Sequence, residues 1–272
     1  MSNFDARDHA MKQNVLQESF GWEVPVDSIP LPSAGLIYHP DSRLYNRSSL
    51  DIKAMTAHEE DILSSQALIK NGTVIDQLIK SCLIDKKINV EELISGDKTA
   101  LMVAIRITGY GADYHAKSSC ESCNHGNDVV IDLSDLEIKR LKIAPITEGE
   151  NKFKYTLPVS KKEVIFKFLS LKELKERDSK KNFYKNNLKM TVENNVTSFI
   201  ESSIISIDGI TDRHKISQFV KNMPALDSRK LRLYIDNHEP GVDMTHSFKC
   251  ASCGHITNSS IPITSEFFWP TT

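Results

Sequence analysis

The sequence predicts an α+β fold, with a mainly helical body, small β-hairpins and a zinc-ribbon-like four-cysteine site that joins the middle and C-terminal segments. Three observations predict it. Apolar residues recur at helical spacing through 54–109, short alternating runs at 153–169 indicate a hairpin, and two C-x-x-C pairs lie 126 residues apart. The 272 residues are 40% hydrophobic and 26% charged, which is typical of a globular protein with its own core.

Composition and turn signals divide the chain into five segments. Four prolines interrupt any regular pattern before residue 54, but the apolar residues there predict that this arm packs on its own core or on a partner. A helix is expected near residues 10–20. The segments are an N-terminal arm (1–53), a helical subdomain (54–112), a first zinc-knuckle hairpin (113–135), an α/β insert with a basic stretch (136–240), and a second zinc knuckle with an aromatic C-terminal tail (241–272).

Cap residues place the helices of the second segment. Thr56 and Glu59 form the T-x-x-E pattern of a capping box, which predicts a helix running to about residue 70. Thr73 opens the next helix, whose apolar face includes Cys82, so this thiol is expected in the core. Asp97 is expected to be the N-cap of a third helix.

Alternation and periodicity place the elements of the insert. Residues 153–157 and 164–169 alternate apolar with polar side chains, as a β-hairpin does. Asp208-Gly209 is expected to form a turn. Helices are expected over 171–187, 192–207, 216–222 and 227–237.

Two cysteine pairs carry the clearest chemistry in the chain. Cys120 and Cys123 form one C-x-x-C pair, and Cys250 and Cys253 form the other. Two intervening residues let both sulfurs of a pair approach one ion, and four thiolates complete a tetrahedral shell around Zn²⁺ without an open position. The sequence therefore predicts a structural zinc site that fixes the end of the chain to its middle.

The two pairs resemble each other beyond the cysteines. The second cysteine of each pair is followed by a residue that tolerates a left-handed turn, Asn124 or Gly254, and then by a histidine. Each knuckle continues into an apolar strand, and Ile131 matches Ile261 at an offset of 130 residues. Two hairpins facing each other across one ion would produce this pattern.

Other uses of the cysteines remain open at this level. They could form two independent redox motifs or disulfides, or this member of its family could have lost the metal. His125 or His255 could replace a thiolate, although four sulfurs already fill the shell. A catalytic zinc is disfavoured, because such sites keep a position for water and the sequence has no H-E-x-x-H motif.

Charge and hydropathy exclude several classes of function. The net charge is −2, and no apolar run approaches the length of a membrane span. The polar N-terminus predicts no secretory signal, so we expect a reducing cytoplasm. Residues 137–189 contain 15 Lys and Arg against 7 Asp and Glu, which predicts either a solvated face or a surface for an acidic partner. No phosphate-binding loop, dinucleotide motif or nucleophile elbow is present in the sequence.

Four segments, in order, resemble the baseplate hub proteins of T-even-like contractile-tail phages. They are LPSAGLIY at 31–38, MTAHEEDIL at 55–63, the run 96–111, and the tail 240–270, which begins PGVD and ends FFWP. The resemblance spans roughly residues 30–270. It implies a non-enzymatic late protein of hub assembly, either a subunit or an assembly factor, made in the host cell cytoplasm and retained in the virion tail in the first case.

The resemblance also implies partners. These would be other baseplate hub proteins, with the tape-measure protein as a further candidate. Phe267, Phe268 and Trp269 are the expected partner-binding residues, since buried aromatic anchors carry much of the energy of an interface. The alternative for these rings is that they cap their own core. A nucleic-acid-binding zinc-ribbon protein and a metallo-hydrolase are the competing functions, and the slightly acidic chain disfavours the former.

Overall fold

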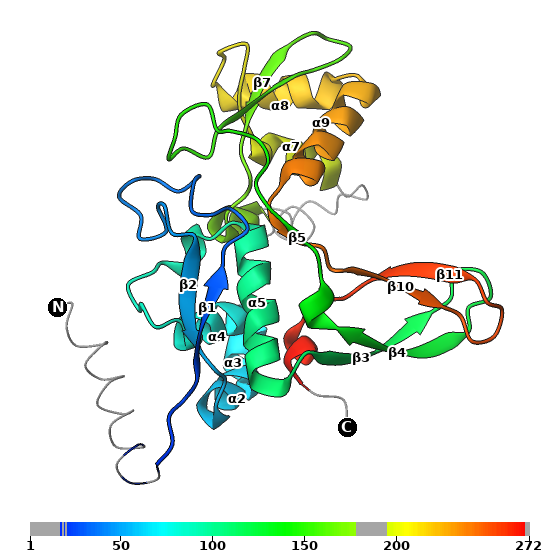
Figure 1. Ribbon diagram of the computed structural model, residues 1–272. Coiled ribbons are helices and arrows are strands. Elements are labelled where there is room, and N and C mark those ends of the chain that lie inside the picture. The colour runs from blue at the N-terminus through cyan, green and yellow to red at the C-terminus, as the bar shows by residue number, and fades with distance from the viewer. Residues whose placement is uncertain (1–16, 18, 20, 178–194, 270–272) are drawn as a thin grey trace.

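In the computed structural model, α5 lies at the centre of the molecule and the other regions surround it (Figure 1). The structure describes residues 17, 19, 21–177 and 195–269. On one side of α5 lie the first two strands and three helices; on the other, two long hairpins project outward (Figure 1). The helices are α2 (Ala57–Ser64), α3 (Gln66–Lys70), α4 (Val74–Cys82), α5 (Ser95–Tyr110), α7 (Asn195–Ser203), α8 (Arg213–Asn222) and α9 (Ala225–His238), with short 3₁₀ turns η1 (Val90–Glu92), η2 (Leu133–Asp135) and η3 (Ser265–Phe268).

The strands form small antiparallel sheets. Pairs are β1–β2, β3–β4, β5–β9 and β10–β11, and β6–β7–β8 form a three-stranded sheet. These pairs confirm the α+β class, but a mainly helical body is not confirmed, because short antiparallel strands are distributed along the described chain from β1 to β11. The bounds are β1 (Val26–Pro30), β2 (Ser49–Lys53), β3 (Asp113–Ser119), β4 (Gly126–Asp132), β5 (Ile138–Lys139), β6 (Phe153–Thr156), β7 (Glu163–Phe166), β8 (Ile204–Ile207), β9 (Gly241–Val242), β10 (Thr245–Lys249) and β11 (Ile256–Ser260).

The capping box at the start of α2 is confirmed. Thr56 and Glu59 exchange hydrogen bonds between their side chains and backbones. The helix does not run unbroken to residue 70, however, because Ser65 has an extended ψ of 104° and separates α2 from α3. Thr73 is the N-cap of α4, and the side chain of Cys82 is completely buried, both as predicted.

The start of α5 differs from the prediction. Ile94 is the N-cap, so the expectation that Asp97 caps this helix is wrong. The buried Asp97 carboxylate instead accepts hydrogen bonds from the backbone N–H of Ser33 (3.0 Å), the Ser33 hydroxyl (2.5 Å) and the Tyr38 hydroxyl (2.6 Å). Burial raises the pKa of Asp97 although these donors act to lower it. The sequence analysis predicted a local role for Asp97 as a helix cap, whereas its side chain binds Ser33, which lies 64 positions earlier in the chain.

Close backbone packing joins α5 to β9. A Cβ atom at Gly96 would lie 1.7 Å from the carbonyl oxygen of Pro240 and 2.6 Å from the Cα of Gly241. Only glycine permits this approach. β9 pairs with β5, so residues 140–240 form an insert whose two ends lie next to each other, beside the first turn of α5.

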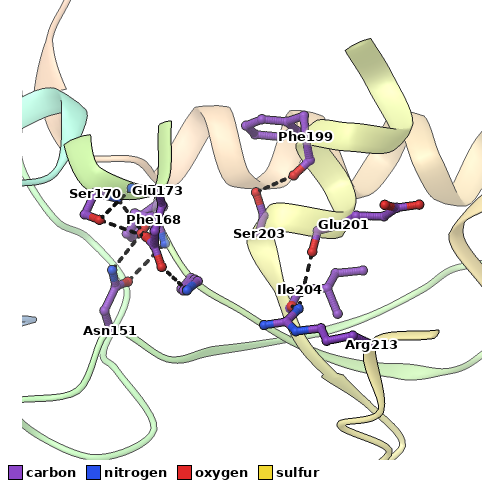
Figure 2. Close-up of polar contacts among 10 residues, drawn as sticks. Asn151, Phe168, Ser170, Glu173, Phe199, Glu201, Ser203, Ile204 and Arg213 are labelled. Carbon is purple, nitrogen blue, oxygen red and sulfur yellow. Dashed lines mark hydrogen bonds and ion pairs between the residues drawn. The ribbon is translucent and has the colours of Figure 1, made fainter. Parts of the chain in front are cut away.

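The three-stranded sheet contains a second departure from the sequence prediction. The hairpin of β6 and β7 is confirmed, but the helix expected over 192–207 ends at Ser203, after which β8 pairs with β7. Two hydrogen bonds lie at this boundary: the Ser203 hydroxyl donates to the carbonyl of Phe199 at 2.9 Å, and the Arg213 guanidinium donates to that of Ile204 at 2.6 Å (Figure 2). Arg213 thus occupies the carbonyl of Ile204, the first residue of β8, and the pairing of β8 with β7 replaces the hydrogen bonds of a continuing helix.

The same view shows how the sheet connects to the segment after it. The Asn151 side chain donates to the carbonyl of Phe168 at 2.7 Å and accepts from its N–H at 3.0 Å (Figure 2). Ser170 and Glu173 exchange bonds at the start of the following helical residues, 171–177. The rest of the helix predicted over 171–187 lies outside the described residues, as does most of the one predicted near 10–20.

One hydrophobic core extends through the regions that the structure describes. It includes residues of the N-terminal arm such as Leu31 and Leu50, the inner faces of α4 and α5, the sheet residue Phe166, and Phe268 near the end of the chain. Within the described part of the chain, none of the helices has the length and apolar character needed to cross a membrane.

Gly96 provides a direct test of the contact between α5 and β9. Replacing Gly96 by Ala forces the Pro240 carbonyl away, so the free energy of unfolding should fall by about 3 kcal/mol. Urea denaturation measures this change. Gly126→Ala is the matched control, because a Cβ there meets no atom within 4 Å. Equal stability of the two variants would contradict the close contact.

Glu59 gives the fold a specific acid sensitivity. Its buried carboxylate accepts from Lys53 Nζ (2.6 Å), Ser81 Oγ (2.5 Å) and Thr56 Oγ1 (2.6 Å). Burial acts to raise the pKa of Glu59, but these donors lower it to about 2. The folded-state pKa is thus depressed, so the stabilisation is present above the ordinary value of 4.5 and is lost as pH falls toward 2.

Glu59→Gln should remove that dependence. At pH 7 the variant should lose about 2–3 kcal/mol of unfolding free energy, because the largely buried Lys53 ammonium loses its counter-ion. Between pH 4.5 and 2, its stability should fall less steeply than that of the wild type. Urea titrations at several pH values measure both slopes, and parallel slopes would show that Glu59 does not cause the acid sensitivity.

Candidate metal centre

The two hairpins bring the four predicted cysteines together. The first knuckle hairpin, β3–β4, carries Cys120 and Cys123 at its tip, and the second, β10–β11, carries Cys250 and Cys253. All four sulfur atoms lie within 4.8 Å of one another. Residues 127 or more positions apart in sequence thus form one group that could hold a metal ion.

The distances fit a tetrahedral thiolate centre. Sγ of Cys120 lies 3.7 Å from Sγ of Cys253, and Sγ of Cys123 lies 3.7 Å from Sγ of Cys250. Metal–sulfur bonds of about 2.3 Å at tetrahedral angles place neighbouring sulfurs about 3.8 Å apart. A disulfide would require about 2.05 Å, and all four thiols are free. The sulfurs are therefore spaced for a shared ion and not for disulfide bonds.

The two knuckles have the same backbone geometry. The N–H of Cys120 donates to the carbonyl of His125 at 2.9 Å, and the N–H of Cys250 donates to that of His255 at the same distance. The turn residues Asn124 and Gly254 have positive φ values of 55° and 73°. The predicted similarity at an offset of 130 therefore extends from the sequence to the hydrogen bonds.

Backbone donors prepare two of the sulfurs to be thiolates. The N–H groups of Cys123 and Ser122 lower the pKa of Cys120 to about 6, although its burial acts against them. The N–H groups of Cys253 and Ser252 likewise lower the pKa of Cys250. The backbone of each knuckle therefore favours the charged form of its own first sulfur, which is the form that binds metals.

The pKa of Cys123 moves in the opposite direction. The N–H of His125 acts to lower it, but the neighbouring sulfurs of Cys253, Cys250 and Cys120, together with partial loss of water around the thiol, raise it to about 12. Adjacent thiolates repel one another, so all four can be ionised together only beside a cation. This arrangement favours a bound metal ion over free thiols.

Two contributors were missed by the sequence analysis. Asn127 and Thr257 are both buried, and each side chain lies 3.7 Å from a cysteine sulfur of the opposite hairpin. Both residues occupy the second position after the knuckle histidine and are 130 residues apart. That shared position was the available signal, but the residue types differ and neither is a usual metal ligand.

The histidines contribute through their backbones. The side chains of His125 and His255 are exposed, and their carbonyl groups accept the cysteine N–H bonds described above. Within the described residues, the group of four sulfurs includes neither histidine. Their place fits the predicted role as knuckle residues beside the ligands.

The aromatic tail is mostly internal. Phe267 and Phe268 are fully buried, and the Phe267 ring lies 5.3 Å from that of Tyr114 and 5.3 Å from that of Phe268. Trp269 is 38% exposed and lines a cavity of about 380 Å³ between β3 and β11. Of the three rings predicted to bind a partner, the indole alone retains substantial exposed surface.

Comparison with known proteins identifies the family. The family model described as T4 bacteriophage base plate protein matches residues 42–269. This match covers most of the chain, so the protein belongs to that family of phage baseplate proteins, which implies a place in the virion tail. No curated protein and no solved structure matches the chain.

Removing one sulfur should remove the metal. The wild-type chain is expected to bind one ion, and Cys120→Ser should bind none and unfold at a lower temperature, because metal binding stabilises the folded state. Elemental analysis and thermal melts measure the two effects. Cys82→Ala is the control: it perturbs the core without touching the centre and should keep the full metal content. A metal-free wild type would contradict the centre.

Proposed function

We propose that this protein acts in assembly of the baseplate hub, as a hub subunit or an assembly factor, through protein–protein contacts and without enzymatic activity. The observation that carries the proposal is the combination of baseplate family membership with a four-cysteine group at the meeting point of two distant hairpins. Its partners would be other hub proteins and, as a further candidate, the tape-measure protein. Assembly would take place in the host cytoplasm.

We propose zinc as the bound ion. Four thiolates are soft ligands, and closed tetrahedral sulfur sites are typical of structural Zn²⁺. The ligands would be Cys120, Cys123, Cys250 and Cys253. Such a shell leaves no position for a substrate or a reactive water, which supports a structural role and disfavours the metallo-hydrolase reading.

A cross-link between the two hairpins would suit a protein that must keep its shape while other proteins bind to it. The ion would cross-link segments 127 residues or more apart and so fix the two projecting hairpins to each other. Closing a loop of that size lowers the entropy of the unfolded chain, and ion binding adds to folding free energy. The exposed Trp269 and the rim of the cavity beside it would be available to a partner.

Affinity capture from infected cells, beside mass spectrometry of purified particles, tests the proposal. Tagged wild-type protein should capture other baseplate proteins from the lysate. Its presence in mature tails would identify a hub subunit, and its presence in lysate complexes alone would identify an assembly factor. Capture of nucleic acid in a salt-dependent manner, without baseplate proteins, would support the zinc-ribbon alternative and contradict the hub role.

A further inference from the structure

The two knuckle hairpins exchange side chains at the metal centre. Asn127 belongs to the first hairpin but contacts Cys250 of the second; Thr257 belongs to the second but contacts Cys120 of the first. We propose that Asn127 and Thr257 are a reciprocal pair of positioning residues, each of which holds the buried thiolate of the opposite hairpin in place for the metal ion. This inference rests on the metal site of the proposed function.

Asn127 contacts residues of both hairpins. Its Nδ2 donates to the carbonyl of His125 at 2.9 Å and lies 3.7 Å from Sγ of Cys250. Its Oδ1 accepts from the backbone N–H of Ala251 at 2.9 Å. The buried amide of Asn127 therefore bonds to its own knuckle through His125 and contacts the opposite knuckle at both Cys250 and Ala251.

Thr257 performs the corresponding task in the other direction. Its hydroxyl accepts from the backbone N–H of Glu121 at 3.4 Å and lies 3.7 Å from Sγ of Cys120. Glu121 follows Cys120 as Ala251 follows Cys250, so the contacts repeat at an offset of 130 residues. A hydroxyl and a carboxamide are chemically different, but both can donate to a sulfur and accept from an N–H at once.

Only the two buried sulfurs receive these donors. Cys120 and Cys250 are 1% and 2% exposed, whereas Cys123 and Cys253 are exposed. Thiolates without water need protein donors, because a buried anion with unfilled hydrogen-bonding capacity is costly. The exchanged side chains supply that need, and they do so only when the two hairpins are docked.

Residues that orient metal ligands in this way are expected to control affinity. Loss of such a contact commonly lowers metal affinity by about ten- to a hundred-fold. Since each contact crosses between hairpins, removing either one should also loosen the opposite ligand. We therefore expect Asn127 and Thr257 to affect the same ion from opposite sides, although neither coordinates it.

Three substitutions in the full-length chain test the proposal. Thr257→Val removes the hydroxyl at nearly constant shape, and Thr257→Ser restores it. Asn127→Asp keeps an oxygen for the Ala251 N–H but removes the amide that donates to Cys250 and to the His125 carbonyl. Ser247→Ala is the control, because Ser247 bonds to Asn258 within the second hairpin and touches no sulfur.

Chelator competition with Zn²⁺ gives the affinity, and Co²⁺ substitution gives a spectroscopic signature of the sulfurs. Thr257→Val and Asn127→Asp should each lower Zn²⁺ affinity by about ten- to a hundred-fold. They should also shift the sulfur-to-cobalt charge-transfer band to lower energy, since the sulfur lone pairs lose a donor. Thr257→Ser and Ser247→Ala should match the wild type in both measurements.

The outcomes separate this inference from the proposed function. If wild-type protein binds one Zn²⁺ tightly but the variants keep its affinity and its cobalt band, the positioning role is overturned and the metal site stands. A fall in metal-free stability with an unchanged cobalt band would also overturn it, since that indicates packing alone. A wild-type protein that binds neither ion would overturn the metal site and the inference together.

Discussion

The first turn of α5 is the constraint on which the arrangement of the molecule depends. At this turn the Asp97 carboxylate holds the loop containing Ser33 and Tyr38, and Gly96 allows the chain at Pro240 to approach within backbone contact. Three parts of the sequence therefore meet within a few residues. Because β9 starts beside this contact and leads directly into β10, the position of the second hairpin is set here, whereas the first hairpin follows from the opposite end of the same helix.

The four-cysteine group adds a second contact between the hairpins, at the end opposite to α5. β5 and β9 pair near the base of the two hairpins, and the four sulfurs meet at their tips. The hairpins are thus joined at both ends, so they resist sliding and separation more than either contact would alone. Neither hairpin has enough apolar surface to be stable by itself, since two-stranded ribbons are marginal in water. The buried Asn127 and Thr257 side chains join the two hairpins directly, and an ion bound by the four cysteines would add the stabilisation that a larger core otherwise provides.

Local signals could be predicted from the sequence, and among the long-range contacts the meeting of the two cysteine pairs was predicted because four thiolates suit one ion. The capping box of Thr56 and Glu59 and the two C-x-x-C pairs depend on spacings of two or three residues, and the structure has them as predicted. Asp97 was misread because its local pattern suits an N-cap, whereas its actual donors lie some 60 residues earlier. The helix expected to reach residue 207 was misread for the same reason, since β8 exists through its pairing with β7. Asn127 and Thr257 are polar residues whose partners come from another hairpin, so no single segment identifies them.

The differences between the two knuckles show what this centre requires. Asn124 and Gly254 have different side chains but share a positive φ. Asn127 and Thr257 carry different chemical groups, but each group can both donate and accept a hydrogen bond. The common requirement is therefore geometric: a left-handed turn after the second cysteine, and a short polar side chain two residues beyond the histidine. Two hairpins that meet this requirement, held at a fixed spacing by α5 and its contact with β9, bring four sulfurs to the separation that one tetrahedral ion demands. The centre is thus a product of the fold as much as of the four cysteines.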